Sequence, residues 1–249
     1  MNDPFAEPSD TRQAILGAAF RALCEHGYAN VTIQRIGDEF DKSPSLVYHH
    51  YDGKDDLLID LLSFLLDEFE ASIADGSVTG PSADGAAGEG DVPEMAPEEA
   101  FDRSAREQLD GYLTAAVDPA SLEDAYAPDE RFVTVMTELR SQAASDEAYR
   151  DHFDRSDRVF GKYLERLVRE AAADIARDGA EVAGNGASDG SSDAVTASEV
   201  AATLQTFATG GMFRWATTND GAWVGDARAG IDRYLEATLP LVETNGSEK

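Results

Sequence analysis

The sequence has only one cysteine, Cys24, among its 249 residues, which excludes a framework of internal disulfides. It has no apolar run of about 18 residues, which excludes a membrane-spanning helix. The amino terminus, MNDPFAEPSD, has neither a basic segment nor an apolar stretch and therefore does not look like a secretory signal. Together these absences predict a soluble, cytoplasmic protein.

Positive charge is also scarce. Lys and Arg number 20 against 49 Asp and Glu, and the formal net charge is −29. Only four of the cations are lysines: Lys42, Lys54, Lys162 and Lys249. Dense carboxylates keep a surface hydrated and dispersed where salt screens charge strongly, and the composition resembles that of proteins from halophiles that accumulate salt. The alternative, an acidic disordered chain, is disfavoured by long amphipathic segments.

Two segments, residues 75–97 and 178–195, are poor in large apolar residues and rich in Gly, Ser, Asp and Ala, which predicts flexible loops. Elsewhere the apolar residues recur at helical spacing, and no alternating run is long enough to indicate a sheet. We therefore predict an all-α fold. The expected helices cover residues 10–26, 33–40, 44–50, 54–74, 98–117, 129–143, 146–177, 197–218 and 226–244.

The segment 32–51, TIQRIGDEFDKSPSLVYHHY, has the pattern of two short helices joined by a tight turn. An apolar face over 33–40 is followed by a polar break. The second helix begins with Ser43 as N-cap and Pro44 at the first helical position, where the missing N–H of proline needs no partner. Small side chains at its start suit a helix that enters the DNA major groove, which is about 12 Å wide. The segment therefore indicates a helix-turn-helix.

Residues 11–62 resemble the N-terminal domain of TetR/AcrR-family regulators. The residues that agree in order and spacing are Ile15, Leu16, Ala18, Ala19, Leu23, Gly27, Tyr28, Thr32, Ile33, Ile36, Ser43, Tyr48, His49, His50, Tyr51, Lys54, Asp55, Leu57 and Leu58. The resemblance implies a helix-turn-helix head over 1–53 and a helical ligand-binding and dimerisation domain over 54–249. It also implies a repressor, not an enzyme. A homodimer of this protein would bind a palindromic operator and be released by a small apolar or amphipathic effector, with no cofactor.

The resemblance further implies a set of DNA contacts. These are Thr32, Lys42, Ser43, Pro44, Ser45, Leu46, Tyr48, His49 and Lys54. Lys42 and Pro44 depart from the family, which often has valine at the first position and a cation at the second. Residues 1–60 hold 11 acidic and 5 basic residues, so the head has no basic patch. We therefore expect DNA binding through amides, hydroxyls and cation uptake, with a shallow or inverted dependence on salt.

Several other interpretations were weighed. Adjacent histidines on a helix, such as His49 and His50, point about 100° apart, and no Cys or carboxylate stands at ligand spacing, so no metal site is expected. Cys24 is expected in or near the core, with redox sensing as the alternative. The chain lacks a phosphate-binding glycine loop or nucleophile elbow. The alternative function is a helical interaction protein whose helix-turn-helix no longer reads DNA.

The C-terminal domain predicts a ligand pocket and a dimer interface. The pocket is expected among Phe132, Met136, Leu139, Phe160, Phe207 and Met212. Arg140 and His152 are candidates to orient a ligand, with solvation or ion pairing as the alternative. The interface is expected among Val200, Leu204, Gly211, Ile231, Leu235 and Leu239. A dimer would also place two recognition helices about 34 Å apart, as a palindrome requires, whereas a monomeric bundle is the alternative.

Overall fold

The computed structural model describes residues 5, 8–40, 44–74, 103–121, 130–183 and 195–239, without the side chains at 44, 130 and 178–183. Within these ranges the chain is helical and contains no strand, which confirms the all-α prediction. The chain divides into two units. Unit 1 comprises Met1–Asp102 and Pro119–Asp157, and unit 2 comprises Arg103–Asp118 and Arg158–Lys249. The predicted loop at 75–97 lies outside the described residues, as do residues 184–194 of the second predicted loop.

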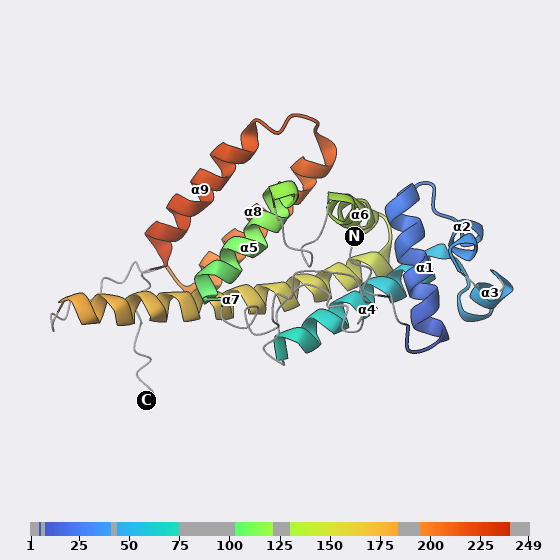
Figure 1. Ribbon diagram of the computed structural model, residues 1–249, viewed down its shortest axis with the longest axis horizontal. Helices are drawn as coiled ribbons and strands as arrows, with labels where there is room; N and C mark the ends of the chain where they lie inside the picture. Colours follow the sequence, from blue (N-terminus) through green and yellow to red (C-terminus); the bar gives the residue numbers. More distant parts are fainter. Residues whose placement is uncertain are drawn as a thin grey trace, which may run out of the picture. The chain divides into compact units, whose positions relative to one another are not determined.

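Unit 1 begins with the head (Figure 1). The head contains α1 (Thr11–His26), α2 (Ile33–Asp38), the 3-10 turn η1 (Pro44–Leu46) and α3 (Val47–His50). The long α4 (Lys54–Ala74) follows it. The short η3 (Pro119–Ser121), α6 (Glu130–Gln142) and the first part of α7 (Glu147–Ala183) complete the unit. These bounds confirm the predicted helices to within a few residues. The helix predicted at 44–50 differs in that its first turn is 3-10.

The sequence sets the ends of the head helices. The Asp10 side chain accepts a hydrogen bond from the backbone N–H of Gln13 at 2.8 Å, and Thr32 accepts one from the N–H of Arg35 at 3.2 Å. α1 ends at Gly27, whose φ of 70° is a left-handed conformation that a residue with a Cβ rarely adopts. The chain therefore turns sharply from α1 towards α2.

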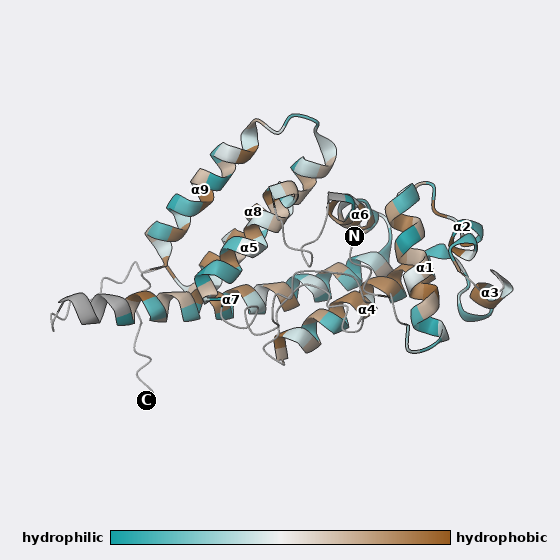
Figure 2. Cartoon of the chain, in the orientation of Figure 1, coloured by the Kyte–Doolittle hydropathy of each residue, from teal (hydrophilic) through white to brown (hydrophobic). Residues whose placement is uncertain are grey.

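The core of unit 1 forms where α1 packs against α2, α4 and α6. Its largest fully buried side chains are Ile15, Leu16, Leu23, Ile36, Leu57, Leu58, Leu61, Leu62, Leu139 and Tyr149. Figure 2 shows the apolar residues of α4 that supply much of this core. Burying one such aliphatic side chain contributes about 1.5–3 kcal/mol. The short α2 and α3 depend on this core, because helices under about 12 residues are marginal on their own.

Unit 2 contains α5 (Ala105–Val117), α8 (Ala197–Thr217), α9 (Trp223–Thr238) and the part of α7 that follows Asp157. A capping box begins α5 at Ser104 and another begins α8 at Thr196. α7 continues to Ala183, so the loop predicted from 178 starts too early. One glycine in a helix costs only about 1 kcal/mol, and the composition of this segment therefore does not end a long helix.

α5 packs closely along α8 and also contacts α9. At Gly211 a Cβ would overlap Val117 Cγ1 and approach the Ala116 carbonyl oxygen to 3.2 Å, so the missing side chain permits the close approach of the two helices. Arg228 of α9 donates to Asp110 Oδ1 of α5 at 2.9 Å and also to the Thr114 hydroxyl. Unit 2 is therefore joined by both close packing and ion pairing.

The residues predicted for the dimer interface are buried within the chain itself. Val200, Leu204 and Leu235 are 0% exposed, Leu239 1%, Ile231 6%, and Gly211 is buried against α5. Helical periodicity identifies an apolar face, but it cannot distinguish a face that packs inside one chain from one that packs on a second copy. α8 exposes different side chains from those predicted for the interface: Phe207 is 37% exposed and Phe213 is 57% exposed.

The Gly211 contact generates a stability prediction. Gly211→Ala should destabilise the protein by about 1–3 kcal/mol, because the added methyl overlaps Val117 in a packed helix pair. Gly111→Ala on α5 is the matched control, since a Cβ there meets nothing within 4 Å. The control should be neutral or stabilise by up to about 1 kcal/mol through helix propensity. Urea denaturation of both variants measures the difference, and equal stability would contradict this account of the packing.

His152, on the part of α7 in unit 1, is a buried polar side chain that is 8% exposed. Burial lowers its pKa to about 4, with the charge of Arg155 acting in the same direction and that of Asp67 opposing it. Arg155 is itself held by α4, because it donates to Asp67 at 2.6 Å and to Glu70. His152 is therefore neutral at physiological pH.

This burial generates a pH prediction. An unfolded histidine takes up its proton near pH 6.5, whereas folded His152 does so only near its pKa of about 4. The free energy of unfolding should therefore fall as the pH drops through this window, by at most about 3 kcal/mol from this group. Denaturant titrations of wild type and His152→Leu between these pH values check it. The variant should show a shallower loss, and parallel curves would refute the assignment.

Candidate DNA-binding site

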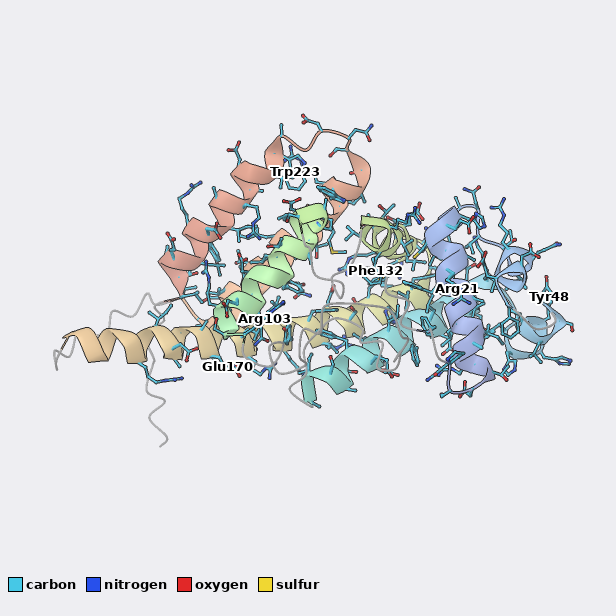
Figure 3. The ribbon with its side chains drawn as sticks, viewed as in Figure 1. Arg21, Tyr48, Arg103, Phe132, Glu170 and Trp223 are labelled. Carbon is cyan, nitrogen blue, oxygen red and sulfur yellow. The ribbon has the colours of Figure 1, made fainter. Side chains whose placement is uncertain are left out.

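One face of η1 and α3 is open to solvent. Tyr48 is 64% exposed and lies at the outer edge of the head (Figure 3). Ser45 and His49 are exposed as well, Leu46 is half-buried, and Val47 is fully buried and attaches the segment to the core. Seven residues thus combine an inward anchor with an outward row of hydroxyl, phenol and imidazole groups. These groups can bond phosphate oxygens or base edges.

Other predicted DNA contacts have different surroundings. Lys42 and Ser43 lie outside the described residues, and of Pro44 only the backbone is described. Thr32 is exposed at the start of α2, where its hydroxyl already accepts the N–H of Arg35. Their contacts with DNA stay predictions.

Lys54 packs on the turn between α1 and α2. Its ammonium donates to the Tyr28 carbonyl oxygen at 3.0 Å and lies 4.1 Å from the centre of the Tyr28 ring. Lys54 therefore supports the head from within, and a further contact with phosphate would use its remaining donors.

Tyr28 lies in the turn after α1 and contacts α4, α6 and α7, all within unit 1. Its backbone N–H donates to Glu138 Oε2 of α6 at 2.7 Å, and its hydroxyl donates to Asp55 Oδ1 of α4 at 2.9 Å. Tyr149 of α7 donates to the same Asp55 oxygen at 3.0 Å, and its ring meets the Tyr28 ring edge-on. Burial and the hydrogen bond to Asp55 raise the pKa of Tyr28 to about 12. The turn after α1 is thus linked directly to α6 and α7.

A second polar cluster ties the end of α3 to α1 and α4. Asp60 Oδ2 accepts from the Tyr51 hydroxyl at 2.7 Å and from Arg12 Nε at 2.9 Å, while Asp60 Oδ1 accepts from Arg12 Nη2 at 2.6 Å. Tyr51 directly follows α3 and is 8% exposed. We call these three residues the Asp60 cluster.

The described cations of the head are all bound by the protein. Arg12 pairs with Asp60, and Arg21 donates to the Glu39 carbonyl oxygen at 3.2 Å. Arg35 donates to the Asn30 carbonyl oxygen at 2.7 Å, and Lys54 bonds Tyr28. Among residues 8–40 and 44–60 every Lys and Arg side chain has a protein partner, and over residues 1–60 acidic residues outnumber Lys and Arg by 11 to 5, so the head presents no net positive charge to DNA.

The predicted pocket residues fall in both units. In unit 1, Leu139 belongs to the core, with Phe132 and Met136 packed against it. In unit 2, Phe160 contacts Tyr112, and Phe207 meets the Tyr234 ring edge-on at 5.5 Å. Met212 is half-buried. A pocket among these residues stays a prediction.

Arg140 is ion-paired, as the alternative interpretation expected. It donates to both carboxylate oxygens of Asp157, at 3.0 and 2.6 Å, and lies over the Phe153 ring. Cys24 is half-buried and packs against the core of unit 1. Across the described ranges, no group of three or more His, Cys, Asp or Glu side chains is placed to hold a metal ion. Every helix in the described part is too short or too polar to cross a bilayer.

Sequence analysis assigned no role to Asp60, Glu138 or Tyr149. Asp60 and Arg12 are 48 positions apart, Glu138 and Tyr28 are 110, and Tyr149 and Asp55 are 94. No local spacing signals such pairs, because folding alone brings them together.

The sequence matches a known family over the head. Residues 15–61 fit the family described as "Bacterial regulatory proteins, tetR family". This range covers α1, α2, η1, α3 and the first part of α4.

Curated relatives match a segment of 55 to 57 residues of this chain. The HTH-type transcriptional repressor AcnR of Corynebacterium glutamicum is 36% identical over 55 residues, 22% of this chain and 29% of that protein. The HTH-type transcriptional regulator BetI of Brucella anthropi is 35% identical over 57 residues, 23% of this chain and 29% of that protein. The matched region thus spans less than a third of the length of these relatives.

Solved structures extend the likeness beyond the head. A TetR transcription regulator from Haloarcula marismortui is 28% identical with a TM-score of 0.62, covering 94% of this chain and 100% of that one. A protein from Saccharomonospora viridis, solved in complex with choline, shares the fold at 19% identity and a TM-score of 0.57, over 93% of this chain and 97% of that one. Residues 15–61 therefore match the tetR family, and the chain shares the all-helical fold of a solved TetR regulator.

Proposed function

We propose that this protein is a DNA-binding transcription regulator that acts as a homodimer on a palindromic operator and releases it on binding a small molecule. The observation that carries the proposal is the tetR-family match over the same residues that form the open η1–α3 face. Relatives named as transcriptional repressors match 22% of this chain, which favours repression.

The surroundings of the head support a mode of binding that uses little positive charge. Over residues 1–60 acidic residues outnumber Lys and Arg by 11 to 5, and the side chains of Ser45, Tyr48 and His49 are exposed. Contacts of this kind position a protein on phosphates without releasing many counterions. With the net charge of −29, this favours a protein adapted to concentrated salt, in which DNA binding changes little with salt concentration.

The outer faces of α8 and α9 support a homodimer. Phe207 and Phe213 of α8 are exposed, and the Tyr234 ring of α9 lies against Phe207. Exposed aromatic side chains of this kind are enriched at protein interfaces. We infer that these residues, rather than the buried ones predicted from the sequence, meet the second copy.

The hydrogen bonds around Tyr28 and Asp55 support coupling between ligand binding and DNA binding. A ligand that moves α6 or α7 would act on the head through Glu138 and Tyr149, both of which hydrogen-bond to the Tyr28–Asp55 pair. Coupling requires the ligand to bind more tightly to the arrangement of α6 and α7 in which the head cannot bind DNA. The effector is expected to be small and apolar or amphipathic. The likeness of fold to a protein solved with choline is compatible with a ligand that combines methyl groups and charge.

DNA binding is tested by selecting duplexes from a random pool with wild-type protein at about 2 M KCl, where electrostatic binding is strongly screened. Tyr48→Ala and Lys42→Ala should each weaken binding to the selected duplex by about 10-fold, the value of one charge-assisted contact. Lys162→Ala, which removes an exposed lysine of α7, is the control and should bind as wild type does.

The salt dependence is measured on the same duplex by fluorescence anisotropy from about 0.1 to about 3 M KCl. Because acidic residues outnumber basic ones in the head, the affinity should change with a shallow or inverted slope. A steep loss of affinity would refute the low-charge mode. If no duplex is enriched, the alternative of a helical interaction protein replaces the proposed function.

The dimer is tested by sedimentation. Phe213→Asp should shift the protein from twice the chain mass of 26.7 kDa to the monomer, because a charge would be buried in the interface. Ile175→Asp, at a 42% exposed apolar residue of α7, is the control and should stay dimeric. A monomeric wild type, or equal dissociation of both variants, would contradict the proposed interface.

A further inference from the structure

We propose that Asp60 of α4 is a positioning residue that sets the orientation of α3 on DNA, acting through Tyr51 with the support of Arg12. The inference rests on the proposed function, because it concerns how the head reads DNA. It adds a residue that does not itself face the DNA-reading surface.

The short recognition segment needs such a residue. η1 and α3 together cover only residues 44–50, well below the length of about 12 residues at which an isolated helix becomes stable. Val47 attaches the segment to the core and is fully buried. The half-buried Leu46 packs against the same core, but apolar contacts of this kind are not directional. A second, directional anchor therefore helps to fix the direction in which Ser45, Tyr48 and His49 point.

Tyr51 supplies the second anchor. Its backbone N–H donates to the Val47 carbonyl oxygen at 3.0 Å and closes the last turn of α3, so the two anchors are coupled. Its ring is buried, and its hydroxyl reaches Asp60 Oδ2 at 2.7 Å. The end of α3 is thereby fixed to a defined point on α4.

Arg12 fixes Asp60 in turn. The Arg12 guanidinium donates two hydrogen bonds to the Asp60 carboxylate, at 2.9 and 2.6 Å. Such a bidentate pair restricts the orientation of the carboxylate as well as its distance. The guanidinium also lies 5.9 Å from the centre of the Phe64 ring. The Asp60 oxygens therefore accept three donors from two elements, and the carboxylate has little freedom to turn away from Tyr51.

The chemistry of the cluster suits a protein that works in salt. Burial alone would raise the pKa of Asp60, but the hydrogen bonds from Arg12 and Tyr51 lower it below its usual value, so the carboxylate stays ionised. The Asp60 side chain is 28% exposed and that of Arg12 is 45% exposed, so salt screens their ion pair. The hydrogen bond from Tyr51, a residue that is 8% exposed, is the part of the anchor that is better shielded from salt.

The test compares Tyr51→Phe, Asp60→Asn and the double variant in the full-length protein. Tyr51→Phe keeps the buried ring and removes only the hydroxyl. Tyr163→Phe is the matched control, because it removes a hydroxyl that donates to Gln108 Oε1 at 3.4 Å from a ring that is 6% exposed in unit 2. Two measurements are made: the Kd and active fraction on the selected duplex, and amide hydrogen exchange over residues 44–51.

Tyr51→Phe should raise the Kd about 3- to 10-fold, less than the full value of one hydrogen bond to a charged group because the apolar contacts of α3 remain, with the active fraction unchanged. Exchange over 44–51 should accelerate, and adding Tyr51→Phe to Asp60→Asn should have little further effect. A merely structural role would lower the active fraction at constant Kd. The proposal is overturned if Tyr51→Phe keeps the wild-type Kd and exchange, or if Tyr163→Phe raises the Kd equally.

The proposed DNA binding and the proposed anchoring of α3 give separate experimental outcomes. If wild type enriches no DNA, the proposed function is lost. Faster exchange over 44–51 in Tyr51→Phe but not in Tyr163→Phe would then still support the anchoring of α3 by Asp60.

Discussion

A recognition helix of one turn has no stability of its own, so its direction depends on the side chains that attach it to the rest of the head. In this protein those attachments are the buried Val47, the half-buried Leu46 and the Tyr51 hydroxyl on Asp60. Three of the side chains that we propose for DNA contact, Ser45, Tyr48 and His49, lie on this turn or directly before it. The long α4 provides both the apolar residues under the head and the carboxylate that receives Tyr51.

α4 also connects the head to the rest of unit 1. Asp55, near its start, bonds both Tyr28 and Tyr149, and Asp60, about one turn later, bonds Tyr51. A displacement of α7 or α6 that disturbed the first pair would act on the same helix that holds the second. The hydrogen bonds to Asp55 and Asp60 therefore give the proposed ligand response a short physical route along α4.

The sequence predicted much of this architecture because local rules govern it. Asp10, Thr32 and Gly27 set helix ends through their own side chains or conformational freedom, which is why the predicted helix ranges of the head agree with the structure to within a few residues. The buried residues of α8 and α9 were recognised as apolar faces, but their partner was not, since periodicity carries no information on whether a face packs within a chain or between two. The Asp60 cluster and the contacts of Tyr28 with Asp55, Glu138 and Tyr149 could not be predicted, because these residues are polar and distant in sequence.

Acidity and DNA binding are reconciled if the head binds through exposed hydroxyl, phenol and imidazole groups held in a fixed direction rather than through free cations. Hydroxyl-radical footprinting of the selected duplex in concentrated KCl tests this central claim most directly. The account predicts two symmetric protected half-sites whose centres are about 34 Å apart, one for each head of a dimer. An even, unprotected cleavage pattern at every KCl concentration would contradict it.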